Sequence, residues 1–182
     1  MKQAIIFHGT SETKDSFWFP YIIREMETKG YNVSFPELPN ADDPDIARWL
    51  PAALQREYTE DTILLAHSAG CALVLSVLEH IQVKVKQAVL VSGYARPLPG
   101  EDVNKVIQKR YDWEKIAEHV EELILLNADN DPWGCTDSEG RYILDNIGKG
   151  RLIIMKGEGH MGSDRFNQPY REFPFLSRLI VE

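Results

Sequence analysis

Short apolar runs alternate along the chain with longer segments in which apolar residues recur every three or four positions. The apolar runs are mostly continuous and rich in leucine or β-branched residues, which is typical of strands whose two faces are both buried. They predict six strands, at Gln3–Phe7, Asn32–Phe35, Thr62–Ala66, Gln87–Val91, Glu122–Asn127 and Arg151–Lys156. The amphipathic segments predict six helices, at Phe17–Lys29, Pro44–Glu57, Ala69–His80, Trp113–His119, Thr136–Ile147 and Pro174–Val181.

This alternation of strands and helices predicts an α/β fold, a three-layer α/β/α sandwich around a six-stranded parallel sheet. One segment, Gly93–Asp112, departs from the rhythm: it contains P-L-P-G and then a charged stretch, so it is interpreted as a long loop or a short cap. The chain has 182 residues and no shift in composition, against about 150 residues in an average domain. A single domain over residues 1–182 is therefore expected.

The overall charge argues against polyanionic partners. Twenty Lys and Arg residues face 28 Asp and Glu residues, a net charge of −8, so neither nucleic acid nor an anionic membrane is expected as a partner. The longest apolar run, Cys71–Leu75, has five residues, far fewer than a membrane span needs. Two cysteines cannot form a disulfide framework, and no signal-peptide pattern is visible, so a soluble, cytoplasmic protein is expected.

Reactive side chains directly follow several of the predicted strands, and in a parallel sheet these positions meet at one edge. The central signal is A-H-S-A-G, in which Ser68 lies at a strand-to-helix turn. A nucleophilic serine on such a sharp turn needs small residues two positions before and two after it, because larger side chains would collide with the neighbouring strand and helix. Ala66 and Gly70 meet this requirement.

With these motifs in order, the sequence resembles the α/β-hydrolase superfamily. The resemblance spans the chain: F-H-G-T follows the first strand, A-H-S-A-G the third, D-N-D-P-W the fifth and G-E-G-H-M the sixth. It is similar in particular to the small, lidless serine hydrolases of the retinoblastoma-binding protein 9-like family. Two departures are Ala66, where the elbow usually has glycine, and the absence of the Leu-x-Cys-x-Glu motif, so retinoblastoma binding is not implied.

The resemblance implies a minimal α/β-hydrolase fold with strand order 2-1-3-4-5-6 and no large cap domain. It also implies a catalytic triad in the order serine, acid, histidine, which Ser68, Asp131 and His160 fill. The residues support these roles, because a serine hydroxyl needs an imidazole to accept its proton and a carboxylate to orient that imidazole. His160 lies on a Gly-flanked loop, whereas His8 and His67 are interpreted as structural hydrogen-bonding groups.

The acid could come from three aspartates, Asp129, Asp131 and Asp137. Asp131 is preferred because Pro132 favours an extended backbone at the preceding residue and so holds its carboxylate in one place. The D-P-W sequence also matches the position of the acid in the resembling family. Asp129 is expected to brace the turn, and Asp137 is expected to begin the following helix.

Two backbone N–H groups are needed to stabilise the oxyanion of a tetrahedral intermediate. One is expected from Ala69, at the start of the helix, and the other from Thr10, as the H-G-x resemblance implies. Aromatic and apolar side chains on the loops at this edge are candidates for walls of a substrate pocket, although some of them could equally cover the core: Phe17, Trp18, Tyr94, Trp133 and Met161.

Two cofactor motifs fail on their context. The pattern Gly157-x-Gly159-x-x-Gly162 matches a dinucleotide fingerprint, but only 20 residues follow it, too few for the required helix and second strand. The pattern beginning at Asp129 resembles a calcium loop, but Trp133 and Gly140 occupy ligand positions. No metal ion or organic cofactor is therefore expected.

Together these observations predict a carboxylesterase-like serine hydrolase that cleaves a small ester, thioester or related acyl bond through an acyl-Ser68 intermediate. A second interpretation remains open, a catalytically weak protein of the same fold that binds a ligand or a partner protein. A nucleotide-binding, flavodoxin-like domain is disfavoured, because the loop His8–Asp15 has one glycine and two acids and makes a poor phosphate site. The natural substrate, the choice among esterase, thioesterase and amidase, and the oligomeric state stay open.

Overall fold

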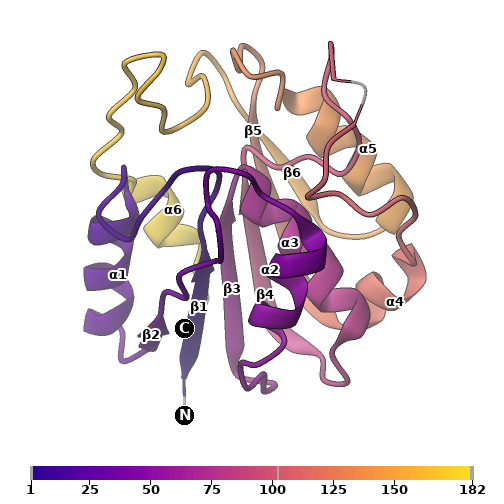
Figure 1. Cartoon of the computed structure of the whole chain (residues 1–182). Coiled ribbons are helices and arrows are strands. Elements are labelled where there is room, and N and C mark those ends of the chain that lie inside the picture. Colours follow the sequence, from indigo (N-terminus) through magenta and orange to yellow (C-terminus); the bar gives the residue numbers. More distant parts are fainter. Residues whose placement is uncertain (1, 102, 181–182) are drawn as a thin grey trace.

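A six-stranded parallel sheet lies between two layers of helices in the computed structural model, which describes residues 2–101 and 103–180 (Figure 1). The strand order is β2-β1-β3-β4-β5-β6, and every pair is parallel, so the predicted fold and strand order are confirmed. The strands are β1 (Gln3–Phe7), β2 (Asn32–Ser34), β3 (Thr62–His67), β4 (Val85–Val91), β5 (Val120–Ala128) and β6 (Arg151–Met155).

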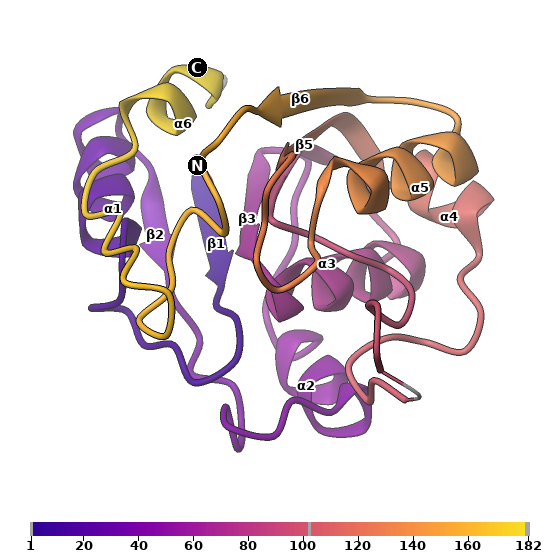
Figure 2. The same ribbon diagram turned by 90° about the horizontal axis from the view of Figure 1, so that it is seen from above.

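The helices divide unequally between the two faces of the sheet. They are α1 (Phe19–Thr28), α2 (Ile46–Ala53), α3 (Ala69–His80), α4 (Trp113–Glu118), α5 (Asp137–Ile147) and α6 (Pro174–Leu179). Helices α1 and α6 cover one face, and the other four cover the opposite face (Figure 2). Helix α3 lies against the middle of the sheet and is buried over Ala69–Leu78, which explains its apolar sequence.

Each central strand contributes to two separate cores. In β1, Ile5 and Phe7 pack into the core under α2 to α5, whereas Ala4 and Ile6 pack into the core under α1 and α6. Successive side chains of a strand point to opposite faces, so a strand covered on both sides needs apolar residues at every position. This arrangement is the physical reason for the unbroken apolar runs in the sequence.

The ends of several elements differ from the prediction. Helix α1 begins at Phe19 instead of Phe17, because Phe17 has a positive φ of 46° that no helix accommodates. Helix α2 is shorter than the predicted Pro44–Glu57: it begins at Ile46, where the Asp45 side chain accepts a hydrogen bond from the Ala47 N–H at 2.9 Å and caps it, and it ends at Ala53. Strands β4 and β5 are longer than predicted, because their pairing extends into polar residues.

The predicted loop Gly93–Asp112 contains no helix or strand in its described part, which omits residue 102. Its later half is anchored to the molecule, because Val106 and Tyr111 are buried and the Ile46 N–H donates to the Lys105 carbonyl at 2.9 Å. The predicted end of the last helix, Val181, lies outside the described residues.

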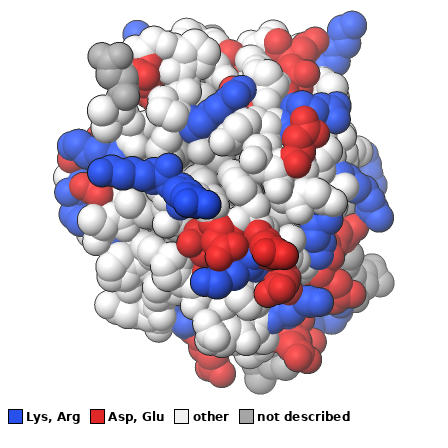
Figure 3. Space-filling view, turned by 90° about the vertical axis from the view of Figure 1, so that its right-hand side faces the viewer, with Lys and Arg blue, Asp and Glu red and all other residues white. Residues whose placement is uncertain are grey.

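The surface and the helices give two further findings. On the side of the molecule that carries α4 and α5, acidic and basic side chains of the described residues are interspersed (Figure 3). Among the described residues, none of the helices is long and apolar enough to cross a bilayer.

Candidate active site

The turn between β3 and α3 places Ser68 in a strained backbone conformation, with φ 52° and ψ −121°. A Cβ atom at Gly70 would lie 2.5 Å from the carbonyl oxygen of Phe7 and 2.7 Å from that of His8. Only glycine fits there, because a methyl group would collide with backbone atoms of β1 and the loop after it. Ala66, the small residue before the turn, is completely buried. The geometry is that of a nucleophile elbow.

Backbone strain gathers around this serine. Besides Ser68, several residues other than glycine have a positive φ on the loops that follow the strands, among them Ser11 at 59°, Phe17 at 46°, Ser92 at 52° and Met161 at 52°. Such conformations cost on the order of 1–3 kcal/mol each and persist only where the surrounding packing enforces them. The strain therefore marks this edge as the functional one.

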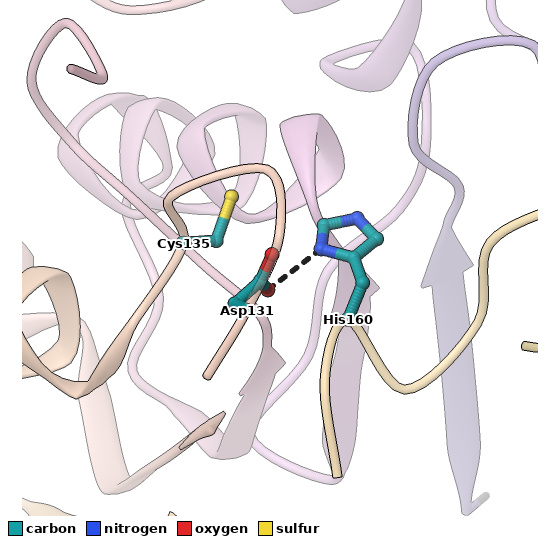
Figure 4. A group of neighbouring side chains, drawn as sticks. All are labelled: Asp131, Cys135 and His160. Carbon is teal, nitrogen blue, oxygen red and sulfur yellow. Dashed lines mark hydrogen bonds and ion pairs between the residues drawn. The ribbon is translucent and has the colours of Figure 1, made fainter. Parts of the chain in front are cut away.

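His160 and Asp131 form the hydrogen bond expected of a base and its orienting acid. The distance from His160 Nδ1 to Asp131 Oδ2 is 2.7 Å, and the two side chains are 6% and 0% exposed (Figure 4). The other carboxylate oxygen of Asp131 accepts a hydrogen bond from the Trp133 N–H at 2.8 Å. Because a carboxylate only accepts, the ring proton lies on Nδ1, and the lone pair of Nε2 is left to act as a base.

The environment of His160 keeps its ring neutral. Burial lowers the pKa of His160 below its ordinary value, because a charged imidazolium is poorly solvated there. The hydrogen bond that His160 donates to Asp131 acts to raise the pKa of His160, and the nearby His67 ring acts to lower it further. At neutral pH the ring is thus unprotonated at Nε2, as a general base requires.

The residues next to the acid hold the loop that carries His160. The Asp129 carboxylate accepts a hydrogen bond from the Gly157 N–H at 2.8 Å, and the Asn130 side chain accepts one from the Gly159 N–H at 2.9 Å. Asp137 is the first residue of α5, away from the histidine. Of the three aspartates considered from the sequence, the structure brings only Asp131 to His160.

Two backbone N–H groups flank the serine. Ala69 is the first residue of α3, where an N–H has no partner within the helix. Next to it, the loop after β1 lies against the elbow, since a Cβ at Gly9 would be 3.0 Å from Ser68 Cβ. The N–H groups of Gly9 and Ser11 are bonded to Glu12 and Ala41, whereas among the described residues the N–H of Thr10 between them has no acceptor.

One group at this site was missed by sequence reasoning. Glu12, which is 8% exposed, forms a hydrogen bond of 2.6 Å with the fully buried His67 ring and accepts a hydrogen bond from the Gly9 N–H at 2.5 Å. No motif signals a buried acid in a polar loop, so the sequence offers little warning of it. The other histidine, His8, braces the loops as expected: its Nε2 accepts from the Leu38 N–H at 3.1 Å.

Ser68 and His160 line one cavity of about 520 Å³. Phe17, Tyr94 and Trp133, three of the residues considered from the sequence, form part of its wall. The other two candidates for the wall lie elsewhere: Trp18 and Met161 are buried in the core under α1 and α6, and they are joined by a hydrogen bond of 3.0 Å from the Trp18 indole to the Met161 carbonyl.

Cys135 lies on the far side of the Asp131 carboxylate from His160 (Figure 4). These three residues offer ligand atoms within 4.8 Å of one another, the spacing of a possible metal site. However, two ligands of a tetrahedral zinc ion are about 3.3 Å apart, whereas the Asp131 oxygen and the His160 nitrogen are 2.7 Å apart and share a proton. Burial also raises the pKa of the Cys135 thiol well above its ordinary value. The arrangement favours a hydrogen-bonded acid and base.

A family model described as serine hydrolase matches residues 4–178, nearly the whole chain. This chain belongs to the serine hydrolase family. YdeN of Bacillus subtilis, which is described as a hydrolase, is 30% identical over 135 residues, covering 71% of each chain. The crystal structure of YdeN matches with a TM-score of 0.86 and 25% identity over 98% of this chain and 96% of the other.

More distant members of the fold are also similar to this serine hydrolase. A YdeN-like hydrolase from Pectobacterium atrosepticum matches with a TM-score of 0.71 and 17% identity, over 98% of this chain and 88% of the other. Esterase PE8 matches with a TM-score of 0.62 and 16% identity, over 98% of this chain and 93% of the esterase chain. At these identities the likeness concerns the fold alone, and it is the α/β-hydrolase fold.

Proposed function

We propose that this serine hydrolase is a carboxylesterase-like enzyme that cleaves small esters, thioesters or related acyl bonds with the triad Ser68, His160 and Asp131. The observation that carries the proposal is the 2.7 Å hydrogen bond between the buried Asp131 and His160 beside a cavity that Ser68 also lines. The strained elbow at Ser68 and the membership of the family support it. The finer likeness to retinoblastoma-binding protein 9-like enzymes rests on the motifs and stays a prediction.

The proposed mechanism follows from the roles of these residues. His160 Nε2 accepts the proton of Ser68 Oγ as this oxygen attacks the acyl carbon, and Asp131 stabilises the imidazolium that forms. The negative charge on the carbonyl oxygen is stabilised by the N–H groups of Thr10 and Ala69, each worth about 3 kcal/mol in such a site. His160 then protonates the leaving group, and a water molecule releases the acyl group from Ser68 by the same steps.

A fluorophosphonate probe tests this function directly, because it reacts covalently only with an activated serine. We expect the purified protein to be labelled at one position, and mass spectrometry of its peptides should locate the probe on Ser68. The variant Ser68→Ala should take up no label and should not hydrolyse p-nitrophenyl acetate, although it should fold normally. A folded wild-type protein that neither takes up the probe nor hydrolyses activated esters would favour the alternative, a binding protein with a hydrolase fold.

A further inference from the structure

His67 lies directly before the nucleophile, and both nitrogens of its ring face oxygen atoms. Its Nε2 is 2.9 Å from the carbonyl oxygen of His160, and its Nδ1 is 2.6 Å from Oε1 of Glu12. A carbonyl oxygen only accepts hydrogen bonds, so Nε2 must carry a proton. If Nδ1 also donates to the Glu12 carboxylate, the ring is an imidazolium that forms a buried ion pair.

Glu12 connects this ring to the loop expected to hold the oxyanion. While Oε1 faces His67, Oε2 accepts the Gly9 N–H at 2.5 Å, immediately before Thr10. The same carboxylate limits the space there, because a Cβ at Gly9 would lie 2.9 Å from Oε1. One side chain therefore determines both the position of the loop after β1 and the orientation of the His67 ring.

From this geometry we propose that Glu12 and His67 act as a charged positioning pair that aligns the oxyanion loop and the His160 loop across the nucleophile elbow. The inference rests on the proposed hydrolase function and extends it. The His67 ring donates to the backbone carbonyl of His160, while the Glu12 carboxylate accepts from the backbone N–H of Gly9. Neither side chain needs to touch the substrate for the pair to affect catalysis.

The surroundings of His67 fit a charged ring. The titratable groups that face it are Glu12, from the loop after β1, and the His160 ring, at a centroid distance of 4.8 Å, with Asp131 further away. The remaining neighbours are aromatic rings packed edge to face, Phe17, Trp18 and Phe19. Burial acts to lower the pKa of His67, but the Glu12 carboxylate and the His160 carbonyl outweigh it, and the pKa of His67 is raised overall.

The charge on His67 also bears on the base. The positive charge on His67 lowers the pKa of His160 more than the negative charge on Glu12 raises it. The pair thus helps to keep His160 unprotonated below pH 6.5, the ordinary pKa of histidine. In wild-type enzyme we expect the acid limb of kcat/KM against pH to have its midpoint below pH 6.5.

The variant Glu12→Gln separates charge from shape. Glutamine can still accept from the Gly9 N–H and can donate to a neutral His67, so every hydrogen bond is retained while both charges are lost. We expect kcat for p-nitrophenyl acetate to fall roughly 10-fold to 100-fold, with KM nearly unchanged, because uncharged hydrogen bonds are weaker and hold the two loops less firmly in place. The acid limb of kcat/KM should move to higher pH, because the lowering effect of His67 on His160 is removed.

Glu139→Gln is the matched control. Glu139 is another buried carboxylate, 4% exposed, which forms an ion pair with Arg96 at 2.9 Å, outside the cavity wall. Its variant should lose a similar amount of thermal stability and keep the wild-type kcat and pH profile. If Glu12→Gln also keeps the wild-type kcat and pH profile, the proposed positioning role is wrong. It is also wrong if the two variants lose activity equally.

A second measurement needs no activity. In Ser68→Ala labelled with ¹⁵N-histidine, NMR should show one ring with protons on both nitrogens well above pH 6.5, and Glu12→Gln in the same background should abolish that signal. A neutral His67 ring at pH 7 would overturn the charged pair. If wild-type protein neither hydrolyses esters nor labels Ser68, the proposed function fails instead, and the NMR result still decides whether the pair is charged.

Discussion

At the scale of single residues, His160, the proposed base, is held from several directions, mostly through its backbone atoms. Its carbonyl accepts hydrogen bonds from His67 and Ser92, both at 2.9 Å, and its N–H donates to the Gln168 side chain at 2.9 Å. Asp131 orients the ring. Sequence motifs pointed to His160, Asp131 and Ser68 as candidates, because the chemistry of a triad restricts the residue type at each position. They could not predict the groups that hold a backbone carbonyl or N–H, because many residue types can do so.

The acid is the residue where a substitution is most informative. In Asp131→Asn, one side-chain position facing His160 becomes an N–H donor, so the ring must reverse its tautomer and Nε2 loses its lone pair. We expect kcat to fall about 10⁴-fold while the fold is kept. Asp129→Asn is the control, because asparagine can still accept the Gly157 hydrogen bond, and its loss should be at most about tenfold. If the measured kcat falls more in Asp129→Asn than in Asp131→Asn, then Asp129 is the acid instead.

At the scale of elements, the sequence predicts which segments form strands and helices better than it predicts their ends. Burial on both faces requires the unbroken apolar runs, so all six strands were predicted, whereas their order was predicted from the resemblance to α/β hydrolases. Their ends depend on pairing instead: Val85 lies opposite Val120, although the following residues are polar. Likewise, α1 starts two residues late because Phe17 has a positive φ. Tertiary contacts set such conformations, and no local pattern reveals them.

The close contact between α3 and β1 at Gly70 can be tested by substitution. Gly70→Ala places a methyl group against two backbone oxygens that cannot move aside, so we expect a loss of about 1–3 kcal/mol in the free energy of unfolding. Gly148→Ala, at the end of α5 with φ 68° and no atom within 4 Å of the added Cβ, introduces strain without collision and should cost about 1–2 kcal/mol. Urea denaturation measures both. Gly70→Ala should also abolish labelling of Ser68, and full labelling would contradict this account of the elbow.

At the scale of the whole molecule, the layers leave the functional edge of the sheet open. The described part of the loop Gly93–Asp112 contains no helix, and residues from both of its halves, among them Tyr94, Leu98 and Lys105, line part of the cavity. In the cavity wall, Phe17 and Tyr94 are buried, whereas the exposed side chains include the charged Lys105 and Arg165 and the apolar Val103 and Trp133. The buried part therefore suits a short apolar group, and the exposed part is mixed and in contact with water.

This gradient predicts the acyl chains that the enzyme prefers. Each methylene buried beside Ser68 should contribute about 0.8 kcal/mol, which is roughly a fourfold gain in kcat/KM. Once the chain reaches the exposed, partly charged part of the wall, further methylenes remain in contact with water, and the gain should stop. We therefore expect p-nitrophenyl esters to give kcat/KM values that rise from acetate to butyrate and then level off or fall toward palmitate. Ser68→Ala measures the background hydrolysis. The highest activity on palmitate, with a jump in rate above its micelle concentration, would contradict the open cavity and indicate that another part of the molecule covers long acyl chains.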